Sequence, residues 1–243
     1  MAKRPAPGRC VHCLLPFGKL TWDHVFPSGW YPDGTPNNIE KWKIPACRDC
    51  NLQHSKSEGE LLIKLGMCID PDDSRSAGIA DKAIRATQSS QGRDERDAAR
   101  REALRQKLLA QTLKGEKVPR SAIYPGFGPM AELPEREQVA MPISATAIRR
   151  LAEKVVRGLI YVLDGKLVEQ PYVVEVHVLD DAGATPIREA LVKHGKAFER
   201  GPGITVTRAV TPEDGLSGFY EVEIWGRFKV YVSVMDSRRE NAT

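Results

Sequence analysis

Hydrophobic and polar residues follow two different patterns in the first seventy residues. Two runs of β-type residues, at residues 20–25 and 41–46, flank the turn-rich stretch FPSGWYPDGTPNN, which predicts a hairpin with a long connection. After this hairpin, hydrophobic residues recur near helical spacing and predict a helix over residues 51–67. Its apolar positions are Leu52, Leu61, Leu62 and Leu65. The predicted order is strand, long loop, strand, helix.

Two further helices and a proline-rich stretch are predicted next. Apolar spacing predicts helices over residues 77–88 and 94–114. The second opens with acidic residues and ends in Lys114-Gly115, as the helix dipole and C-cap preferences favour. Five prolines fall within residues 117–142, which predicts an extended linker between domains.

The last hundred residues have the pattern of an independent α+β unit. A helix over residues 146–162 precedes a strand of alternating valines at residues 172–180. Thr185-Pro186 predicts a helix that starts with Thr185 as N-cap and runs to about residue 194. Gly226-Arg227 has the form of a two-residue hairpin turn. Three further strands are predicted at residues 203–210, 218–225 and 228–235.

These elements assign the chain to the α+β class, with an antiparallel sheet in its C-terminal part. Four regions are expected. They are a compact module at residues 1–68, a helical extension at 69–116, a Pro-rich linker at 117–144, and an α+β domain of unknown role at 145–243.

Composition and charge narrow the class of protein. The chain has 243 residues and a net charge of +4, and the excess of Lys and Arg falls in residues 1–140. No apolar run approaches the ~20 residues of a membrane span, and the basic N-terminus is followed by no apolar signal region. We therefore expect a soluble, cytoplasmic protein with reduced cysteines. The mild charge alone identifies no partner.

Four of the five cysteines form two C-x-x-C pairs, Cys10 with Cys13 and Cys47 with Cys50. Such pairs supply the four thiolates of a closed, structural tetrahedral zinc site. The 33 residues between the pairs exceed the spacing of a simple zinc ribbon, so an insertion lies between them. Two redox pairs or a disulfide framework are the alternatives. Cys68 is expected to be a small buried hydrophobe, and His12 a spacer residue.

The residues between and after the cysteines form an ordered motif. C-x-x-C is followed by D-H-x-x-P from Asp23 to Pro27, then by Asn38, then by C-x-x-C with Asn51 directly after it. In this order they resemble the HNH endonucleases, zinc-stapled nucleases with a ββα-metal fold. The resemblance covers residues 10 to about 56, a fifth of the chain.

The resemblance implies roles for individual residues. Asp23 would be a ligand of catalytic Mg²⁺ or Mn²⁺, and His24 would be the general base that activates water. Asn38 would orient the base, with Asn37 a weaker rival. Asn51 replaces the name-giving final His and would be the second metal ligand, as in HNH enzymes that carry Asn there. His54, on the same face of the predicted helix, is the alternative second ligand.

The implied reaction is hydrolysis of DNA phosphodiester bonds by a one-metal mechanism, leaving 5′-phosphate and 3′-hydroxyl ends. Basic residues near the motif would contact phosphates of DNA, or of RNA. They are Arg9, Lys43, Arg48 and Lys56, with Lys3 and Arg4 at the N-terminus. A role in phage or bacterial defence would fit by analogy.

Two other classes of function remain open. A zinc-stapled module that binds nucleic acid without cleaving it would need the cysteines but not Asp23 and His24. Alternatively, the C-terminal domain binds a protein partner or self-associates, and directs the nuclease. The aromatic residues of the module are expected to form its small core. These residues are Trp22, Phe26, Trp30, Tyr31 and Trp42.

Overall fold

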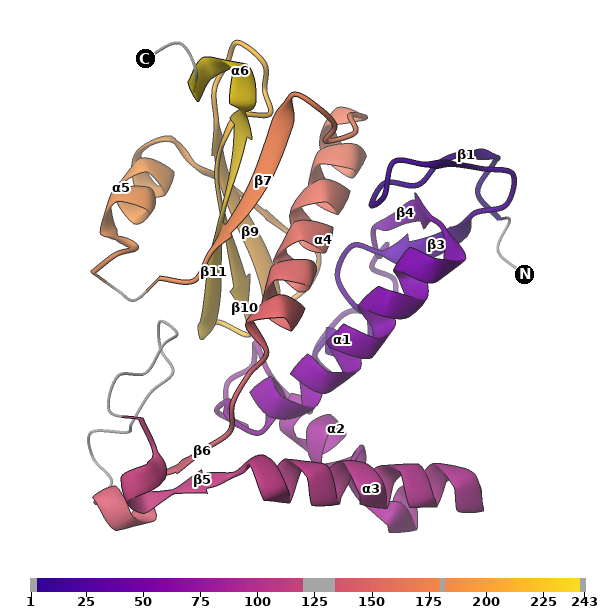
Figure 1. Cartoon of the computed structure of the whole chain (residues 1–243), viewed down its shortest axis with the longest axis vertical. Coiled ribbons are helices and arrows are strands. Elements are labelled where there is room, and N and C mark those ends of the chain that lie inside the picture. Colours follow the sequence, from indigo (N-terminus) through magenta and orange to yellow (C-terminus); the bar gives the residue numbers. More distant parts are fainter. Residues whose placement is uncertain (1–3, 120–133, 180–181, 241–243) are drawn as a thin grey trace.

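A computed structural model describes residues 4–119, 134–179 and 182–240 of the chain (Figure 1). The fold is mixed, with a five-stranded antiparallel sheet in the C-terminal region and two-stranded pairs elsewhere. Within these residues, no helix is both long and apolar enough to cross a membrane.

The N-terminal region has the predicted order of strand, long loop, strand and helix. Strand β3 (Thr21–His24) pairs antiparallel with β4 (Lys43–Ala46), and α1 (Arg48–Gly66) begins one residue after β4 ends. Ahead of the hairpin, β1 (Gly8–Arg9) pairs with β2 (Pro16–Phe17) around the first cysteine pair. The hairpin and helix predicted from the sequence are therefore confirmed, with both strands shorter than expected.

The middle of the chain is helical. The two predicted helices are present but shorter, as α2 (Ile79–Arg85) and α3 (Glu95–Gln111). Short strands β5 (Leu113–Lys114) and β6 (Val139–Ala140) pair with each other, so a segment just before the expected linker pairs with a segment inside it. Residues 120–133 of that linker lie outside the described residues. The region also contains the 3-10 helices η1 (Ser28–Trp30), η2 (Ser89–Gln91), η3 (Gly115–Lys117) and η4 (Glu135–Glu137).

The C-terminal region is one sheet with a helix on each side. All its neighbouring strands are antiparallel, in the order β7-β11-β10-β9-β8. Helix α4 contacts β7, β10 and β11, whereas α5 packs against β9 and β10 (Figure 1). The elements are α4 (Ala145–Asp164), β7 (Tyr172–His177), α5 (Thr185–His194), β8 (Lys196–Glu199), β9 (Ile204–Val210), β10 (Gly218–Ile224), β11 (Phe228–Asp236) and α6 (Ser237–Glu240).

Three local predictions for this region were wrong. Residue Ala184, not Thr185, is the N-cap of α5. The β10–β11 turn comprises three residues, because Trp225 and Gly226 both have positive φ. The Trp225 ring is buried against Trp30 and its Nε1 donates to the Trp30 carbonyl at 2.9 Å, so tertiary packing determines this turn. Strand β8 was missed because its short, mostly exposed sequence KAFE has little hydrophobic alternation.

One buried hydrophobic cluster joins the N-terminal region to the C-terminal region. Phe26, Trp30 and Leu61 belong to the same cluster as Leu151 and Val155 of α4. The predicted division into domains stays a prediction, but the regions on either side of the expected linker share this core. Of the predicted core aromatics, Phe26, Trp30, Tyr31 and Trp42 are buried, whereas Trp22 is 40% exposed.

Gly158 lets α4 approach the hairpin closely. A Cβ at this position would lie 2.9 Å from Val25 Cγ2 and 3.2 Å from Ile44 Cδ1. These contacts are too short for a side chain, so only glycine allows this distance between α4 and the β3–β4 hairpin. The close approach matters for the site, because Lys154 lies one turn earlier on the same face of α4.

Candidate metal centre and active site

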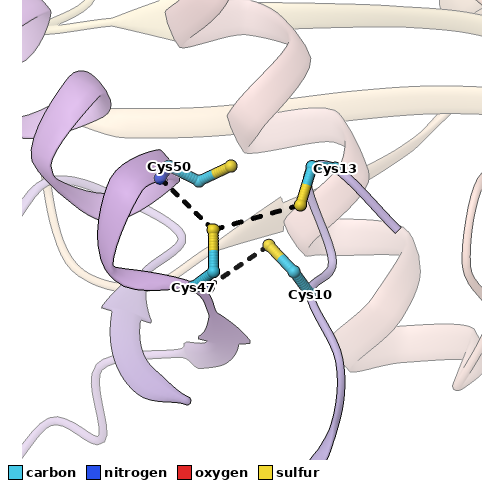
Figure 2. Close-up of side chains that lie close together, drawn as sticks. All are labelled: Cys10, Cys13, Cys47 and Cys50. Carbon is cyan, nitrogen blue, oxygen red and sulfur yellow. Dashed lines mark hydrogen bonds between the residues drawn. The ribbon is translucent and has the colours of Figure 1, made fainter. Parts of the chain in front are cut away.

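The four paired cysteines come together at the start of α1, where their sulfur atoms face one another (Figure 2). All four Sγ atoms lie within 4.8 Å of one another, and those of Cys13 and Cys47 are 3.9 Å apart. Four thiolates at about 2.3 Å from one zinc ion would be about 3.8 Å apart. Cys10, Cys13, Cys47 and Cys50, hereafter the cysteine cluster, can therefore hold a structural metal ion such as zinc.

Backbone amides support the thiolates of this cluster. The Cys47 amide donates to Cys10 Sγ at 3.3 Å, and the Cys50 amide donates to Cys47 Sγ at 3.4 Å, where Cys47 also caps α1. Burial opposes ionisation of Cys10, but hydrogen bonds from the backbone amides of Cys13, Cys47 and His12 outweigh it and lower the pKa of its thiol. The backbone thus directs hydrogen bonds to the sulfur atoms of Cys10 and Cys47. Cys68 is separate from the cluster, and burial raises the pKa of its thiol.

Asp23 and His24 are the last two residues of β3, and their side chains point to opposite faces of the hairpin. The Asp23 side chain is buried, whereas His24 is half-buried and lies opposite Lys43 on β4. Burial and, to a smaller extent, the Lys43 charge lower the pKa of His24. The His24 imidazole is therefore neutral at neutral pH, as a proton acceptor must be.

Both carboxylate oxygens of Asp23 are engaged. Oδ1 accepts from Lys154 Nζ at 2.8 Å, and Oδ2 contacts His12 Nε2 at 3.0 Å. Lys154 Nζ also donates to Glu58 of α1, and the lysine side chain is only 1% exposed. Burial opposes ionisation of Asp23, but His12 and Lys154 outweigh it and lower the pKa of Asp23.

Two histidines complete this group. The rings of His12 and His54 lie 4.3 Å apart between centroids, on the first knuckle and on α1. Burial, followed by the charges of His12 and Lys154, lowers the pKa of His54 to about 3, so His54 is neutral. His12 Nδ1 is buried and has no hydrogen-bond partner among the residues that the structure describes. We call His12, Asp23, His54, Glu58 and Lys154 the Asp23 cluster.

His12 is therefore not the spacer residue expected from its place between Cys10 and Cys13. Its side chain is 6% exposed and connects the cysteine cluster to Asp23. Glu58 and Lys154 were also missed. Each interrupts an apolar helix face: Glu58 lies between His54 and Leu61, and Lys154 lies between Leu151 and Gly158. The sequence feature that could have identified both residues is a charged side chain among the apolar positions of a predicted helix.

The other expected site residues lie around this centre. Asn51 donates through Nδ2 to Thr21 Oγ1 at 3.1 Å and to the Trp22 carbonyl at 3.2 Å, so it fastens α1 to β3. Asn37 and Asn38 are exposed in the loop before β4. In the part of the chain described, no hydrogen bond joins Asn51 to Asp23 or Asn38 to His24. The predicted phosphate contacts are all exposed. These are Arg9, Lys43, Arg48 and Lys56, of which Arg9 pairs with Glu169 at 2.7 Å.

The chemistry of Asp23 fits a hard divalent cation, which prefers carboxylate oxygen. Oxygens of Asp23 and Glu58 converge on one positively charged atom, the Lys154 ammonium. A cation is thus accommodated at this point of the structure. Asp23 would hold a divalent ion there, with a further ligand from α1.

Comparisons with known proteins provide no independent assignment for this site. No protein-family model, no curated protein and no solved structure matches the chain.

Proposed function

We propose that the chain is a metal-dependent endonuclease of the HNH type that hydrolyses DNA phosphodiester bonds, with structural zinc on the cysteine cluster. The observation that carries this proposal is the arrangement of the N-terminal region. A β-hairpin and a helix are joined at the cysteine cluster, and Asp23-His24 end the first strand beside that helix. This arrangement agrees with the resemblance seen in the sequence.

In this proposal His24 receives the proton of the attacking water. It is neutral and half-buried, and no hydrogen bond to its ring occurs among the described residues, so its lone pair is available. Asp23, together with Asn51 or His54, would hold Mg²⁺ or Mn²⁺, which supplies charge stabilisation to the phosphate and to the departing 3′ oxygen. Lys43 and Arg48 are exposed near His24 and α1 and would attract the DNA backbone.

A second candidate is a zinc-stapled module that binds nucleic acid without cleaving it. The observation in its favour is that both oxygens of Asp23 are engaged and buried. If this conformation is permanent, no divalent ion reaches Asp23, and the exposed basic residues serve binding alone.

Cleavage of plasmid DNA distinguishes the two candidates. The purified full chain is incubated with supercoiled, linear or single-stranded DNA, with and without added Mg²⁺ or Mn²⁺. We expect metal-dependent nicks that DNA ligase reseals without kinase treatment, because the ends are 5′-phosphate and 3′-hydroxyl. His24→Ala should lower the rate about 100-fold or more, whereas the exposed His194→Ala should not change it. DNA binding without cleavage would contradict the endonuclease, and equal cleavage by His24→Ala would contradict the role of His24 as the general base.

A further inference from the structure

Lys154 brings a positive charge into the candidate active site from a distant part of the chain. It belongs to α4, 131 residues after Asp23, yet its side chain is 1% exposed and lies between Asp23 and Glu58. The close packing of α4 against the hairpin depends on Gly158, which allows α4 to contact Val25 and Ile44. In Figure 1, α4 lies between the sheet and the N-terminal region, beside α1.

The charges of this cluster do not balance. One ammonium serves two carboxylates, and burial raises the pKa of Glu58 even though Lys154 opposes the rise. His12, on the other side of Asp23, has a buried nitrogen with no hydrogen-bond partner in the described part of the chain. A buried ion pair is rarely more stabilising than apolar residues of similar size. The fold therefore gains little from placing a lysine here for stability alone.

We propose that Lys154 and a divalent cation compete for Asp23 and Glu58, so that the site opens to the metal ion only when the Lys154 ammonium leaves it. Glu58 thereby becomes a metal ligand beside Asp23. The inference rests on the proposed function, because it takes Asp23 as a metal ligand.

The competition follows from the geometry. Lys154 Nζ donates to Asp23 Oδ1 and to Glu58, the oxygens that a divalent ion would need. Two cations cannot share these oxygens in a buried site, because like charges at this distance repel strongly. Binding of a divalent ion must therefore displace the ammonium. Helix α4 in turn links the site to the sheet, since it contacts β7, β10 and β11.

Binding of Mn²⁺ to the zinc-loaded full chain tests this competition. Mn²⁺ prefers oxygen ligands and does not replace zinc on four thiolates. We expect Lys154→Met to bind one Mn²⁺ about tenfold more tightly than the wild-type chain. Adding Asp23→Asn or Glu58→Gln to Lys154→Met should abolish the gain.

Lys229→Met is the matched control. Lys229 also pairs with two carboxylates, Glu221 at 3.2 Å and Glu223 at 3.0 Å, but its side chain is 32% exposed. Its removal should not tighten Mn²⁺ binding. An equal gain in Lys229→Met, or no gain in Lys154→Met, would overturn the proposal.

Chemical labelling of lysines tests the same claim without a substitution, and so applies even where Lys154→Met does not fold. In the metal-free wild-type site, the buried Lys154 amine should resist acetylation. Saturating Mn²⁺ should expose it, whereas Lys64, another buried lysine, should keep its reactivity. Continued protection of Lys154 with Mn²⁺ bound at Asp23 would overturn the competition.

These measurements distinguish a failure of the Lys154 competition from a failure of the proposed endonuclease function. If Mn²⁺ displaces Lys154 and no DNA is cut, the competition holds and the proposed function fails. If DNA is cut by the wild-type chain while Lys154 stays protected, the proposed function holds and the competition fails.

Discussion

The cysteine cluster and the Asp23 cluster lie in the same region and are joined through His12, yet they are assembled differently. The cysteines come from two knuckles, and their four sulfur atoms face one another (Figure 2). The Asp23 cluster is built from residues of the first knuckle, β3, α1 and the distant helix α4, and the ammonium of Lys154 pairs with both of its carboxylates. We therefore expect the first site, but not the second, to depend on a bound metal ion for its stability.

The largest expected effect is on the cysteine cluster. Cys47→Ser removes a ligand and the N-cap of α1, and should unfold the N-terminal region, because structural zinc supplies about 10 kcal/mol or more to small modules. Circular dichroism and zinc content measure the loss. The control is Cys68→Ser, which should retain zinc and fold. Full folding of Cys47→Ser without zinc would remove the contrast between the two clusters.

Removal of Lys154 should have the next largest effect. Lys154→Met leaves Asp23 and Glu58 buried without a cation, and should lower the free energy of unfolding by about 3–5 kcal/mol in urea without divalent ions. Lys229→Met, which breaks a partly exposed pair, should cost less than about 1 kcal/mol. Equal losses in the two variants would mean that the Asp23 cluster behaves as an ordinary surface ion pair.

The contrast between the clusters also defines what the sequence alone could predict. The cysteine cluster was predictable because the two C-x-x-C spacings place their ligands together locally. The hairpin and α1 followed from short-range patterns, and the three long strands of the sheet from hydrophobic alternation. The Lys154–Asp23 contact depends on tertiary packing across 131 residues, so no local pattern contains it. A lysine on the apolar face of a predicted helix indicated only that some acidic partner was needed.

A smaller effect is expected at Gly158, which sets the distance between α4 and the hairpin. Gly158→Ala places a Cβ 2.9 Å from Val25 Cγ2 and should cost about 1–3 kcal/mol in the free energy of unfolding. It should also raise the labelling of Lys154, because α4 is pushed away. Gly59→Ala on α1 is the control: a Cβ there meets nothing within 4 Å, and the change should stabilise by up to about 1 kcal/mol. Unchanged stability in Gly158→Ala would contradict the close docking.

The smallest expected effect concerns a carboxylate held by neutral donors. Burial opposes ionisation of Asp214, but hydrogen bonds from Ser217, Leu216 and Thr211 outweigh it and lower the pKa of Asp214 to about 2 from 3.8. Its ionised form therefore stabilises the fold above about pH 4, and this contribution is lost as the pH falls through 2. Asp214→Asn should cost about 1 kcal/mol at pH 7 and nothing near pH 2, as measured by urea unfolding. If Asp214→Asn lowered the free energy of unfolding equally at both pH values, the charge of Asp214 would not contribute to stability.

Metal analysis after equilibrium dialysis of the full chain against zinc and Mn²⁺ tests the contrast most directly. The wild-type chain should retain one zinc ion and no tightly bound Mn²⁺, and Lys154→Met should retain one zinc ion and one Mn²⁺. A wild-type chain that retains no zinc, or that binds Mn²⁺ through Asp23 as tightly as Lys154→Met does, would contradict the account.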